Sequence, residues 1–313
     1  MNCNCDPGFL DWPTSGADEL VILSARRVGF LGPHGTFTEE ALRSTLLRAP
    51  QEGWRPPDLV PFASIADTIH GVEEGAVECA VVPIENSIEG SVSMTVDYLA
   101  REDHGLQVVR EVRHPIRHRL ITRPEVHLEG ISKVVSHPHA VAQCRIWLRK
   151  NLPGIHVEAA NSTSGAVETV AASSEPWAAI GTAIAAEEYG CIILRDSIED
   201  HDDNETRFVF LSKVRERQDL SEPYKTSVVC ESMKDRPGAL LLILQEFAYR
   251  YINLTKIESR PSKRRLGDYI FLVDMDGRVA DERVAEALSC LACKLPRLVV
   301  LGSYPIGKPP HLS

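Results

Sequence analysis

The sequence predicts an α/β protein whose C-terminal part is a separate ferredoxin-like domain with the element order βαββαβ. The first observation is that short apolar segments alternate with helical patterns from Arg26 onward, which is typical of βαβ units and mostly parallel sheets. The second is that the order of elements changes after a polar segment that ends near residue 224. Residues 26–213 fit either one large sheet or two smaller lobes with a cleft between them, and this pattern favours neither.

Apolar runs bounded by turn residues predict the strands of the first region. These strands are Val28–Leu31, Cys79–Val82, Lys133–Ser136, His156–Ala159, Ala178–Gly181, Ile192–Leu194 and Phe208–Leu211. Apolar residues at helical spacing predict helices at Thr38–Arg48, Ser64–Gly75, Ser91–Arg101, Pro138–Lys150 and Thr163–Ala172. Ser64 followed by Asp67 supports the second helix start, because a hydroxyl can cap the helix and an acid suits its first turn.

The C-terminal domain is predicted by a second, shorter set of elements. Its strands are expected at Thr226–Glu231, Asn253–Glu258, Asp268–Met275 and Leu298–Tyr304, and its helices at Pro237–Tyr251 and Asp281–Leu295. We therefore expect a mobile N-terminal extension (1–24), the first α/β region (25–213), a linker (214–224), the C-terminal domain (225–305) and a tail (306–313).

Composition excludes several classes of protein. The formal net charge of -10 disfavours binding to nucleic acid or to an anionic membrane, because both require a positive surface. No apolar stretch approaches the roughly 20 residues that span a bilayer. Residues 1–23 lack the basic and apolar parts of a secretory signal, so a cytoplasmic location is expected. The eight scattered cysteines then predict reduced thiols.

Three strand-to-helix junctions are rich in hydroxyls, amides and glycines: Gly32–Thr38, Pro83–Ser91 and Asn161–Gly165. Helix N-termini of this kind bind carboxylates or phosphates through backbone N–H groups. Ligands of open α/β sheets gather at these carboxyl ends of strands. The alternative is that the junctions are only caps and tight turns. Their glycines form neither a dinucleotide fingerprint nor a phosphate loop, so a nucleotide is not expected.

A further candidate is Thr206-Arg207-Phe208, which places a hydroxyl, a cation and a ring together at the head of a strand. The acidic run before it, residues 198–205, lacks the spacing of a calcium loop and is expected to be a solvated loop. The histidines form no zinc-binding pattern, and no G-x-S-x-G elbow is present. No metal or organic cofactor is predicted.

Read in order, these motifs closely resemble the prephenate dehydratase family. The matching stretches are VGFLGPHGTFTEEAL from Val28, VVPIENSIEGSV from Val81, SHPHAVAQC from Ser136, NSTSGAV from Asn161, AAIGTAIAAEEYG from Ala178 and NETRFVFL from Asn204. The C-terminal part resembles the ACT domain of that family, with DRPGALLLIL from Asp235 and IESRPSKRRLGDYIFLVDMDG from Ile257. The resemblance implies a two-lobed, periplasmic-binding-protein-like catalytic region. His139 stands where the family commonly has Gln, and Gly181-Thr182 varies a junction that often carries Ser.

The resemblance implies conversion of prephenate to phenylpyruvate, water and carbon dioxide, without a cofactor. Thr206 would be catalytic, as a hydrogen-bond donor to the departing oxygen. The substrate would be bound by Thr36, Phe37, Asn86, Ser87, Ser162, Thr163, Arg207 and Phe208. Arg207 could pair with a carboxylate or only brace its loop.

The resemblance also implies that phenylalanine binds the ACT domain as an allosteric effector. Its site would be formed by Gly238, Ala239, Leu240, Glu258, Ser259 and Arg260. A homodimer or homotetramer through the ACT and catalytic domains would follow. Rival functions are arogenate dehydratase, a prephenate decarboxylase that does not aromatise its product, and a solute-binding module or inactive amino-acid sensor.

Overall fold

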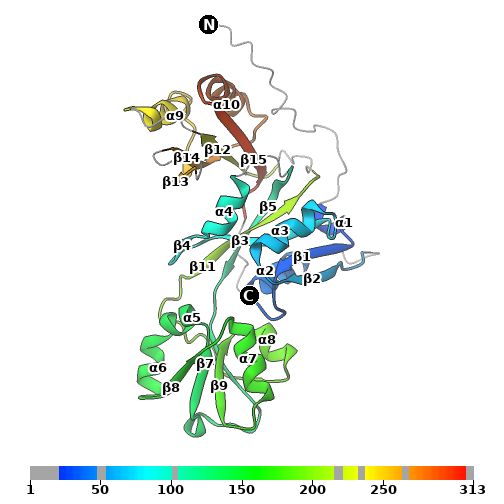
Figure 1. The fold of residues 1–313 in the computed structure, drawn as a ribbon, viewed down its shortest axis with the longest axis vertical. Coiled ribbons are helices and arrows are strands. Elements are labelled where there is room, and N and C mark those ends of the chain that lie inside the picture. Colours follow the sequence, from blue (N-terminus) through cyan, green and yellow to red (C-terminus); the bar gives the residue numbers. More distant parts are fainter. Residues whose placement is uncertain are drawn as a thin grey trace.

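The computed structural model describes residues 21–47, 54–100, 105–214, 221–231, 237–262 and 268–307, and every statement below concerns these residues. The molecule is elongated and consists of three parts in a row (Figure 1). The C-terminal domain lies at one end, a first lobe in the middle and a second lobe at the other end, each with its own sheet.

The first lobe is a sheet of order β2-β1-β3-β11-β5, with the short β4 paired to β3. The strands are β1 Arg27–Leu31, β2 Asp58–Phe62, β3 Cys79–Asn86, β4 Gly90–Ser91, β5 Gln107–Pro115 and β11 Glu205–Ser212. Its helices are α1 Val21–Ser24, α2 Phe37–Leu46, α3 Ile65–Glu73 and α4 Ser93–Leu99. Buried apolar residues of α2, β1 and β11 form one core, in which Phe30, Phe208 and Phe210 are the largest side chains.

The second lobe is a sheet of order β10-β6-β9-β7-β8. Its strands are β6 Arg119–Thr122, β7 Lys133–Ser136, β8 His156–Ala159, β9 Trp177–Gly181 and β10 Ile192–Arg195. The helices are α5 Pro138–Gln143, α6 Arg145–Asn151, α7 Thr163–Ala172 and α8 Ala183–Glu188, with a 3-10 turn η2 at Leu128–Gly130. The single helix predicted at 138–150 is therefore two helices that meet at Cys144.

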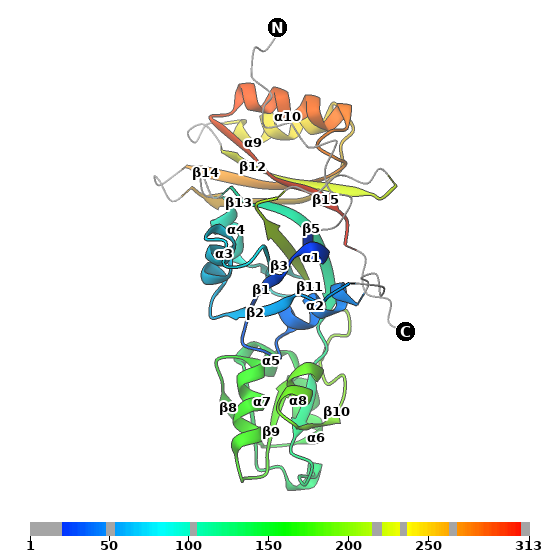
Figure 2. The same cartoon turned by 90° about the vertical axis from the view of Figure 1, so that its right-hand side faces the viewer.

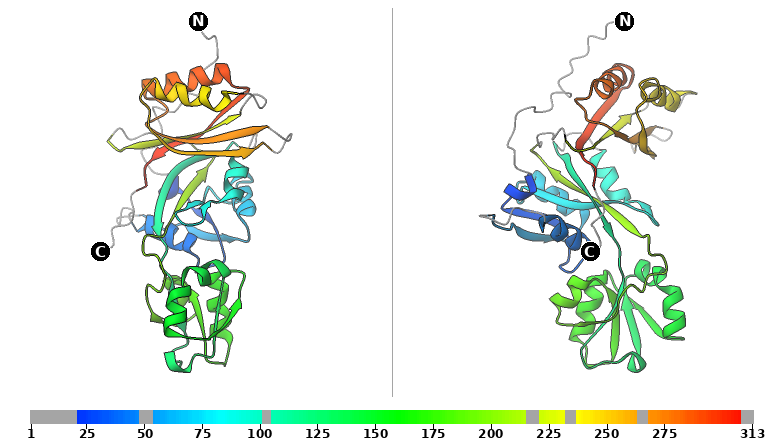
Figure 3. Two further views of the ribbon diagram at one scale, coloured as in Figure 1. Left: turned by 90° about the vertical axis from the view of Figure 1, so that its left-hand side faces the viewer. Right: turned by 180° about the vertical axis from the view of Figure 1, so that it is seen from behind.

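The chain crosses between the lobes twice, from β5 to β6 and from β10 back to β11, which confirms the two-lobed prediction (Figure 3). The expectation of mostly parallel sheets is wrong. In the first lobe β11 is antiparallel to both β3 and β5, and in the second lobe β6 is antiparallel to both β9 and β10. The physical reason is the double crossing, because a strand that returns from the other lobe enters the sheet in the opposite direction.

The C-terminal domain is a four-stranded antiparallel sheet of order β13-β14-β12-β15, with both helices on its outer face (Figure 2). Its elements are β12 Tyr224–Glu231, α9 Ala239–Ala248, β13 Leu254–Pro261, β14 Tyr269–Asp276, α10 Glu282–Lys294 and β15 Arg297–Pro305. The predicted βαββαβ order is confirmed. Within α10, Val284, Leu288 and Leu291 are buried as their spacing predicts. In contrast, Leu240 and Tyr251 are exposed, because Ile243 and Phe247 form the buried face of α9.

The inner face of this sheet packs on the first lobe. Leu301 and Tyr304 of β15 share a core with apolar residues of α3, α4 and β3, and Tyr304 is almost fully buried. Close approach of β15 to β5 depends on Gly302, since a Cβ added there would lie 2.1 Å from the Val108 carbonyl oxygen. The C-terminal domain and the first lobe therefore share an apolar core.

Some expectations about the ends of these parts need correction. Residues 21–24 of the expected extension form helix α1, in which Ile22 is buried, and Trp54 Nε1 donates to the Leu23 carbonyl at 3.0 Å. Mobility of residues 1–20 and of most of the expected linker falls outside the described residues. Cys79, Cys144, Cys191, Cys230 and Cys290 are free, whereas Cys293 is disulfide-bonded and departs from the reduced state expected of it. None of the helices in the described ranges is long and apolar enough to cross a membrane.

The Gly302→Ala variant tests the docking of the C-terminal domain. We expect a loss of about 1–3 kcal/mol in the free energy of unfolding, because the new methyl group must push β15 away from β5. Thermal unfolding followed by circular dichroism measures the effect. Gly130→Ala is the matched control, since a Cβ there meets open space, and its unfolding midpoint should not move. An unchanged midpoint in Gly302→Ala would contradict the close docking.

Candidate active site

Thr206 and Asn86 lie opposite each other where two strands of the first lobe approach the second lobe. Thr206 is the second residue of β11, Asn86 is the last residue of β3, and the two strands are antiparallel. The Asn86 Nδ2 group donates to the Thr206 Oγ1 atom at 2.9 Å. Among the residues that the structure describes, the Thr206 hydroxyl donates no hydrogen bond. Thr206 therefore accepts from Asn86 and keeps its own donor available.

The orientation of Asn86 is fixed by its other contacts. Its Oδ1 atom accepts from the backbone N–H groups of Ile88 and Glu89, both at 2.9 Å. Its Nδ2 group then also donates to Asn204 Oδ1 at 2.8 Å. Both N–H donors and the carbonyl oxygen are thus in use, so Asn86 has no free donor for a substrate carboxylate. In this arrangement Asn86 positions Thr206, which differs from the direct binding role expected from the sequence.

A chain of hydrogen bonds continues from this pair into the second lobe. Asn204 is buried, and its Nδ2 group donates to Gln143 Oε1 at 2.9 Å at the end of α5. The same oxygen lies 2.8 Å from His118 Nε2, directly before β6. This series of hydrogen bonds therefore connects the two lobes at one crossover of the polypeptide. Sequence reasoning missed Asn204, Gln143 and His118 as site residues, although the matching stretches SHPHAVAQC and NETRFVFL contain Gln143 and Asn204.

His118 contributes a buried imidazole to this series of hydrogen bonds. Burial lowers its pKa below the usual value, so the ring is neutral at pH 7 and Nε2 donates to Gln143. The Phe37 ring meets the His118 ring edge to face, with centroids 5.4 Å apart. Phe37 is half-buried and extends from the first turn of α2, so it supplies an apolar surface beside the hydrogen-bond chain.

The junction before α2 holds the two lobes together. Thr36 caps α2 by accepting from Glu39 N, and its hydroxyl donates to the Leu31 carbonyl at 3.0 Å. Gly35 has a φ of +81°. It lies so close to the second lobe that a Cβ added to Gly35 would be 2.9 Å from the Cα atom of Ala185. The Thr182 hydroxyl of the second lobe donates to the Gly35 carbonyl at 2.6 Å. Thr36 thus has a capping role, and Gly35 permits the contact between lobes.

The other two junctions contribute to the same region. Ser162 caps α7 by accepting from Gly165 N at 2.9 Å, and Thr163 opens this helix in a half-buried position. The Ser87 hydroxyl accepts from Glu205 N at 3.0 Å, so it braces the turn after β3. His139 Nδ1 of the second lobe lies 3.4 Å from a Glu89 carboxylate oxygen of the first lobe. The His139 contact thus connects the start of α5 to the turn after β3 across the two lobes, whereas the Ser162 contact lies within the start of α7.

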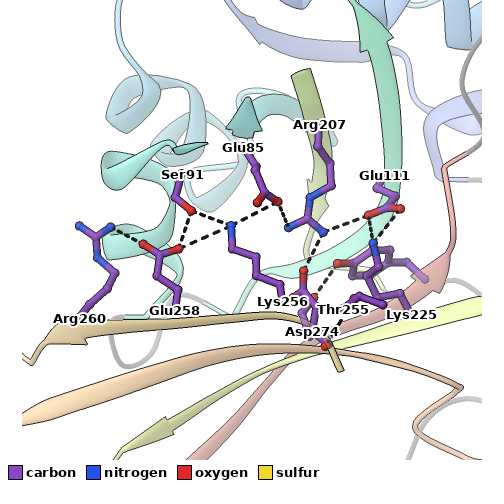
Figure 4. Close-up of polar contacts among 12 residues, drawn as sticks. Glu85, Ser91, Glu111, Arg207, Lys225, Thr255, Lys256, Glu258, Arg260 and Asp274 are labelled. Carbon is purple, nitrogen blue, oxygen red and sulfur yellow. Dashed lines mark hydrogen bonds and ion pairs between the residues drawn. The ribbon is translucent and has the colours of Figure 1, made fainter. Parts of the chain in front are cut away.

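Two residues expected to bind substrate point elsewhere. Phe208 is buried in the core of the first lobe under α2 and is not a wall of a cleft. Arg207 lies on the opposite side of β11 and pairs with Asp274 of the C-terminal domain at 2.7 Å (Figure 4). The alternation of side chains along a strand explains the position of Arg207, since Thr206 and Arg207 must face opposite sides. Phe208 shares the face of Thr206 but lies deeper in the lobe, within the core under α2.

The residues expected to bind an effector are also divided. Gly238 caps α9 with a φ of +85°, and Leu240 is exposed on the first turn. Along the edge strand β13, Ser259 faces away from the catalytic region, whereas Glu258 and Arg260 face it. The Ser91 hydroxyl donates to Glu258 at 2.6 Å, and Arg260 Nε lies 2.8 Å from Asp97. The structure therefore does not bring all six residues to one face.

A cavity of about 700 Å³ lies between the lobes beside α2 and α8, with His114, Arg117 and Arg119 among its lining residues. It is mainly apolar, and Thr206 and Asn86 are not part of its wall. Within the described ranges, no group of three or more His, Cys, Asp or Glu side chains is arranged to hold a metal ion.

Comparisons with known proteins agree with this architecture. Residues 28–216 match the prephenate dehydratase family. A prephenate dehydratase from Methanocaldococcus jannaschii is 41% identical over 275 residues, which cover 88% of this chain and 96% of that protein. The solved structure of prephenate dehydratase from Arthrobacter aurescens, in complex with L-Phe, has a TM-score of 0.81 and 38% identity, covering 90% of each chain. A second solved structure, the quorum quenching acylase GqqA, has a TM-score of 0.77 and 29% identity, covering 90% of this chain and 98% of that one.

The family match covers both lobes, and the relatives cover the C-terminal domain as well. The motif Thr206-Arg207-Phe208 lies within the matched range, and its first residue occupies the hydrogen-bonded position described above. The chain therefore belongs to the prephenate dehydratase family.

Proposed function

We propose that the protein converts prephenate to phenylpyruvate, with Thr206 as the hydrogen-bond donor to the departing hydroxyl group. The observation that carries the assignment to Thr206 is its contact with Asn86. Because Asn86 donates to the Thr206 oxygen, the Thr206 proton is left to point toward a ligand. A hydroxyl that accepts a hydrogen bond is also a stronger donor, since linked hydrogen bonds polarise one another.

The reaction needs little more than charge stabilisation. The ring carboxylate leaves as carbon dioxide, its bonding electrons enter the ring, the ring C–O bond breaks, and the departing hydroxide takes a proton to become water. Thr206 is too weak an acid to supply that proton outright. It acts by a hydrogen bond that strengthens as negative charge develops on the departing oxygen, in the manner of an oxyanion-hole donor.

The carboxylates of prephenate are proposed to lie near the start of α7. Ser162 and Thr163 are half-buried there, and the N-terminus of a ten-residue helix carries positive partial charge. Phe37 would contact the ring of the substrate. Asn86, Thr36 and Ser87 are assigned to positioning, because their polar atoms already have partners.

We assign prephenate and not arogenate as the substrate, because these relatives are prephenate dehydratases. The similarity to GqqA does not change the proposal, because Thr206 and Asn86 form no nucleophile and base pair of the kind that acyl transfer requires.

The C-terminal domain is proposed to be an ACT domain that binds phenylalanine and lowers activity. The relative solved with L-Phe supports this proposal. Gly238, Ala239, Leu240 and Ser259 are the residues proposed for the site, since Glu258 and Arg260 contact the catalytic region here. Tyr249 and Tyr251 are exposed on the same domain, which supports a homodimer or homotetramer. A cytoplasmic location stays a prediction.

Replacement of the Thr206 hydroxyl tests the catalytic assignment. We expect Thr206→Val, which keeps the side-chain shape, to lower kcat by roughly 10²–10³, as for loss of one oxyanion-hole donor. Thr206→Ser keeps the hydroxyl and should retain kcat within about tenfold, the difference reflecting its freer side-chain rotation. Phenylpyruvate formation, followed by its alkaline absorbance, measures both. A Thr206→Val enzyme as active as Thr206→Ser would show that another group assists the departing hydroxyl.

Phenylalanine inhibition tests the effector site. We expect phenylalanine to slow the wild-type enzyme, and Leu240→Glu to raise the required concentration by about tenfold or more, because an unpaired carboxylate would repel the ligand carboxylate. Leu241→Glu is the matched control, since Leu241 is also exposed on the first turn of α9. Titration calorimetry with phenylalanine measures binding directly. Equal responses of the two variants would remove Leu240 from the site.

A further inference from the structure

The two strands that carry Thr206 and Asn86 each present a charged neighbour to the opposite side of the sheet. Arg207 follows Thr206, and Glu85 precedes Asn86. The pairing of β3 with β11 places Arg207 opposite Glu85, and the two side chains lie 3.2 Å apart. The neutral hydrogen bond between Asn86 and Thr206 thus has an ion pair directly beside it, facing the C-terminal domain.

Side chains of the C-terminal domain complete this ion pair. Asp274 of β14 accepts from Arg207 Nη1 at 2.7 Å, and Lys256 of β13 lies 3.3 Å from Glu85 (Figure 4). Glu111 of β5 accepts from Arg207 at 3.2 Å and from Lys225 of β12 at 3.0 Å. Three cations and three carboxylates therefore meet between the first lobe and the C-terminal domain. Both β3 and β11 carry a side chain that contacts the C-terminal domain.

Most of this cluster is buried, and Glu85, whose side chain is 37% exposed, lies at its open side. Asp274 and Glu111 are almost fully buried, and Arg207 is 9% exposed. Burial opposes the charge of Arg207, but Asp274, Tyr304, Glu111 and Glu85 outweigh it and raise the pKa of the guanidinium above its usual value. Removing one partner of such a cluster leaves an uncompensated buried charge, so the arrangement of the remaining groups must change.

The local backbone makes Thr206 sensitive to such a change. Between the Arg207 and Phe208 pairs the register shifts by one residue, so Ile84 is left unpaired in a β-bulge. Bulges bend a strand and re-aim the neighbouring side chains. The bulge is in β3 directly opposite Arg207, so Arg207 lies beside an irregular part of the ladder that also carries the Asn86 and Thr206 pair.

We propose that Arg207 is a positioning residue, whose ion pairs with Asp274 and Glu111 transmit the state of the C-terminal domain to the Thr206 hydroxyl. The regulatory part rests on the proposed binding of phenylalanine. The cluster also extends along β13, the edge strand of the proposed effector domain. Lys256 donates to Ser91 at 2.7 Å, and Ser91 donates to Glu258. A displacement of β13 or β14 would therefore reach Arg207 through direct contacts.

The experiment compares Asp274→Asn with Glu246→Gln. Glu246 is the matched control, because it is a buried carboxylate of the same domain that pairs with Arg250 and Lys294 on the outer helices. We expect Asp274→Asn to lower kcat by about 10-fold to 100-fold with little change in KM, because a misaligned catalytic group costs this much. The rate ratio with and without saturating phenylalanine should approach one, while phenylalanine still binds. Glu246→Gln should match the wild type in all three quantities.

A stable Asp274→Asn enzyme with wild-type kcat overturns the positioning role. A wild-type inhibition ratio in that variant overturns the coupling. If the variant does not fold, as judged by circular dichroism, Arg207→Lys is judged by the same criteria, because lysine keeps the charge but cannot form the two-pronged contact.

Hydrogen exchange provides a readout that needs neither substrate nor effector. Exchange of the backbone amides of residues 205–208, measured by mass spectrometry, should be faster in Asp274→Asn than in Glu246→Gln. The exchange measurement tests the link between Asp274 and residues 205–208 even if the wild type makes no phenylpyruvate. Absence of phenylpyruvate would overturn the proposed function and not this link. Equal exchange in the two variants contradicts the proposal.

Discussion

The position of β11 between β3 and β5 is the constraint on which the rest of the site depends. This strand arrives from the second lobe, so it is antiparallel to both neighbours, and its first residues lie at the interlobe boundary. Thr206 meets Asn86 on one side, and Arg207 meets Asp274 on the other. A single backbone segment thus contacts the proposed reaction site and the C-terminal domain at consecutive residues.

The C-terminal domain could be predicted in detail from the sequence. Each of its elements has a clear period, such as Val284, Leu288 and Leu291 in α10, and the elements are separated by short connections. In the catalytic region the strands β2, β4, β5 and β6 and the helix α8 were missed. β5 carries Arg110, Glu111 and Arg113, charges that disguise a strand, and Glu111 finds its partner Lys225 only in another domain. The antiparallel pairing of β11 could not be predicted either, because the local sequence pattern does not encode the direction in which two strands pair.

The candidate site was predicted in part for a similar reason. The hydroxyls and amides at the three junctions do lie near the boundary of the lobes, as helix-start chemistry suggested. What each polar atom contacts depends on residues far away in the chain, such as Asn204 and Gln143 for Asn86 and His118. Phe208 looked like a pocket wall because a motif shows which residues are adjacent but not how deep in the lobe each one lies.

The contact between Arg207 and Asp274 has a consequence for how such proteins can be recombined. A compact βαββαβ domain joined through one segment resembles a module that could be exchanged between relatives by cutting near residue 221. The buried cluster makes this exchange conditional, since Asp274 and Lys225 must arrive with charges that match Arg207 and Glu111. Chimaeras should therefore be assembled by matching the two sides of this interface, and the pair of positions 207 and 274 should change together in evolution.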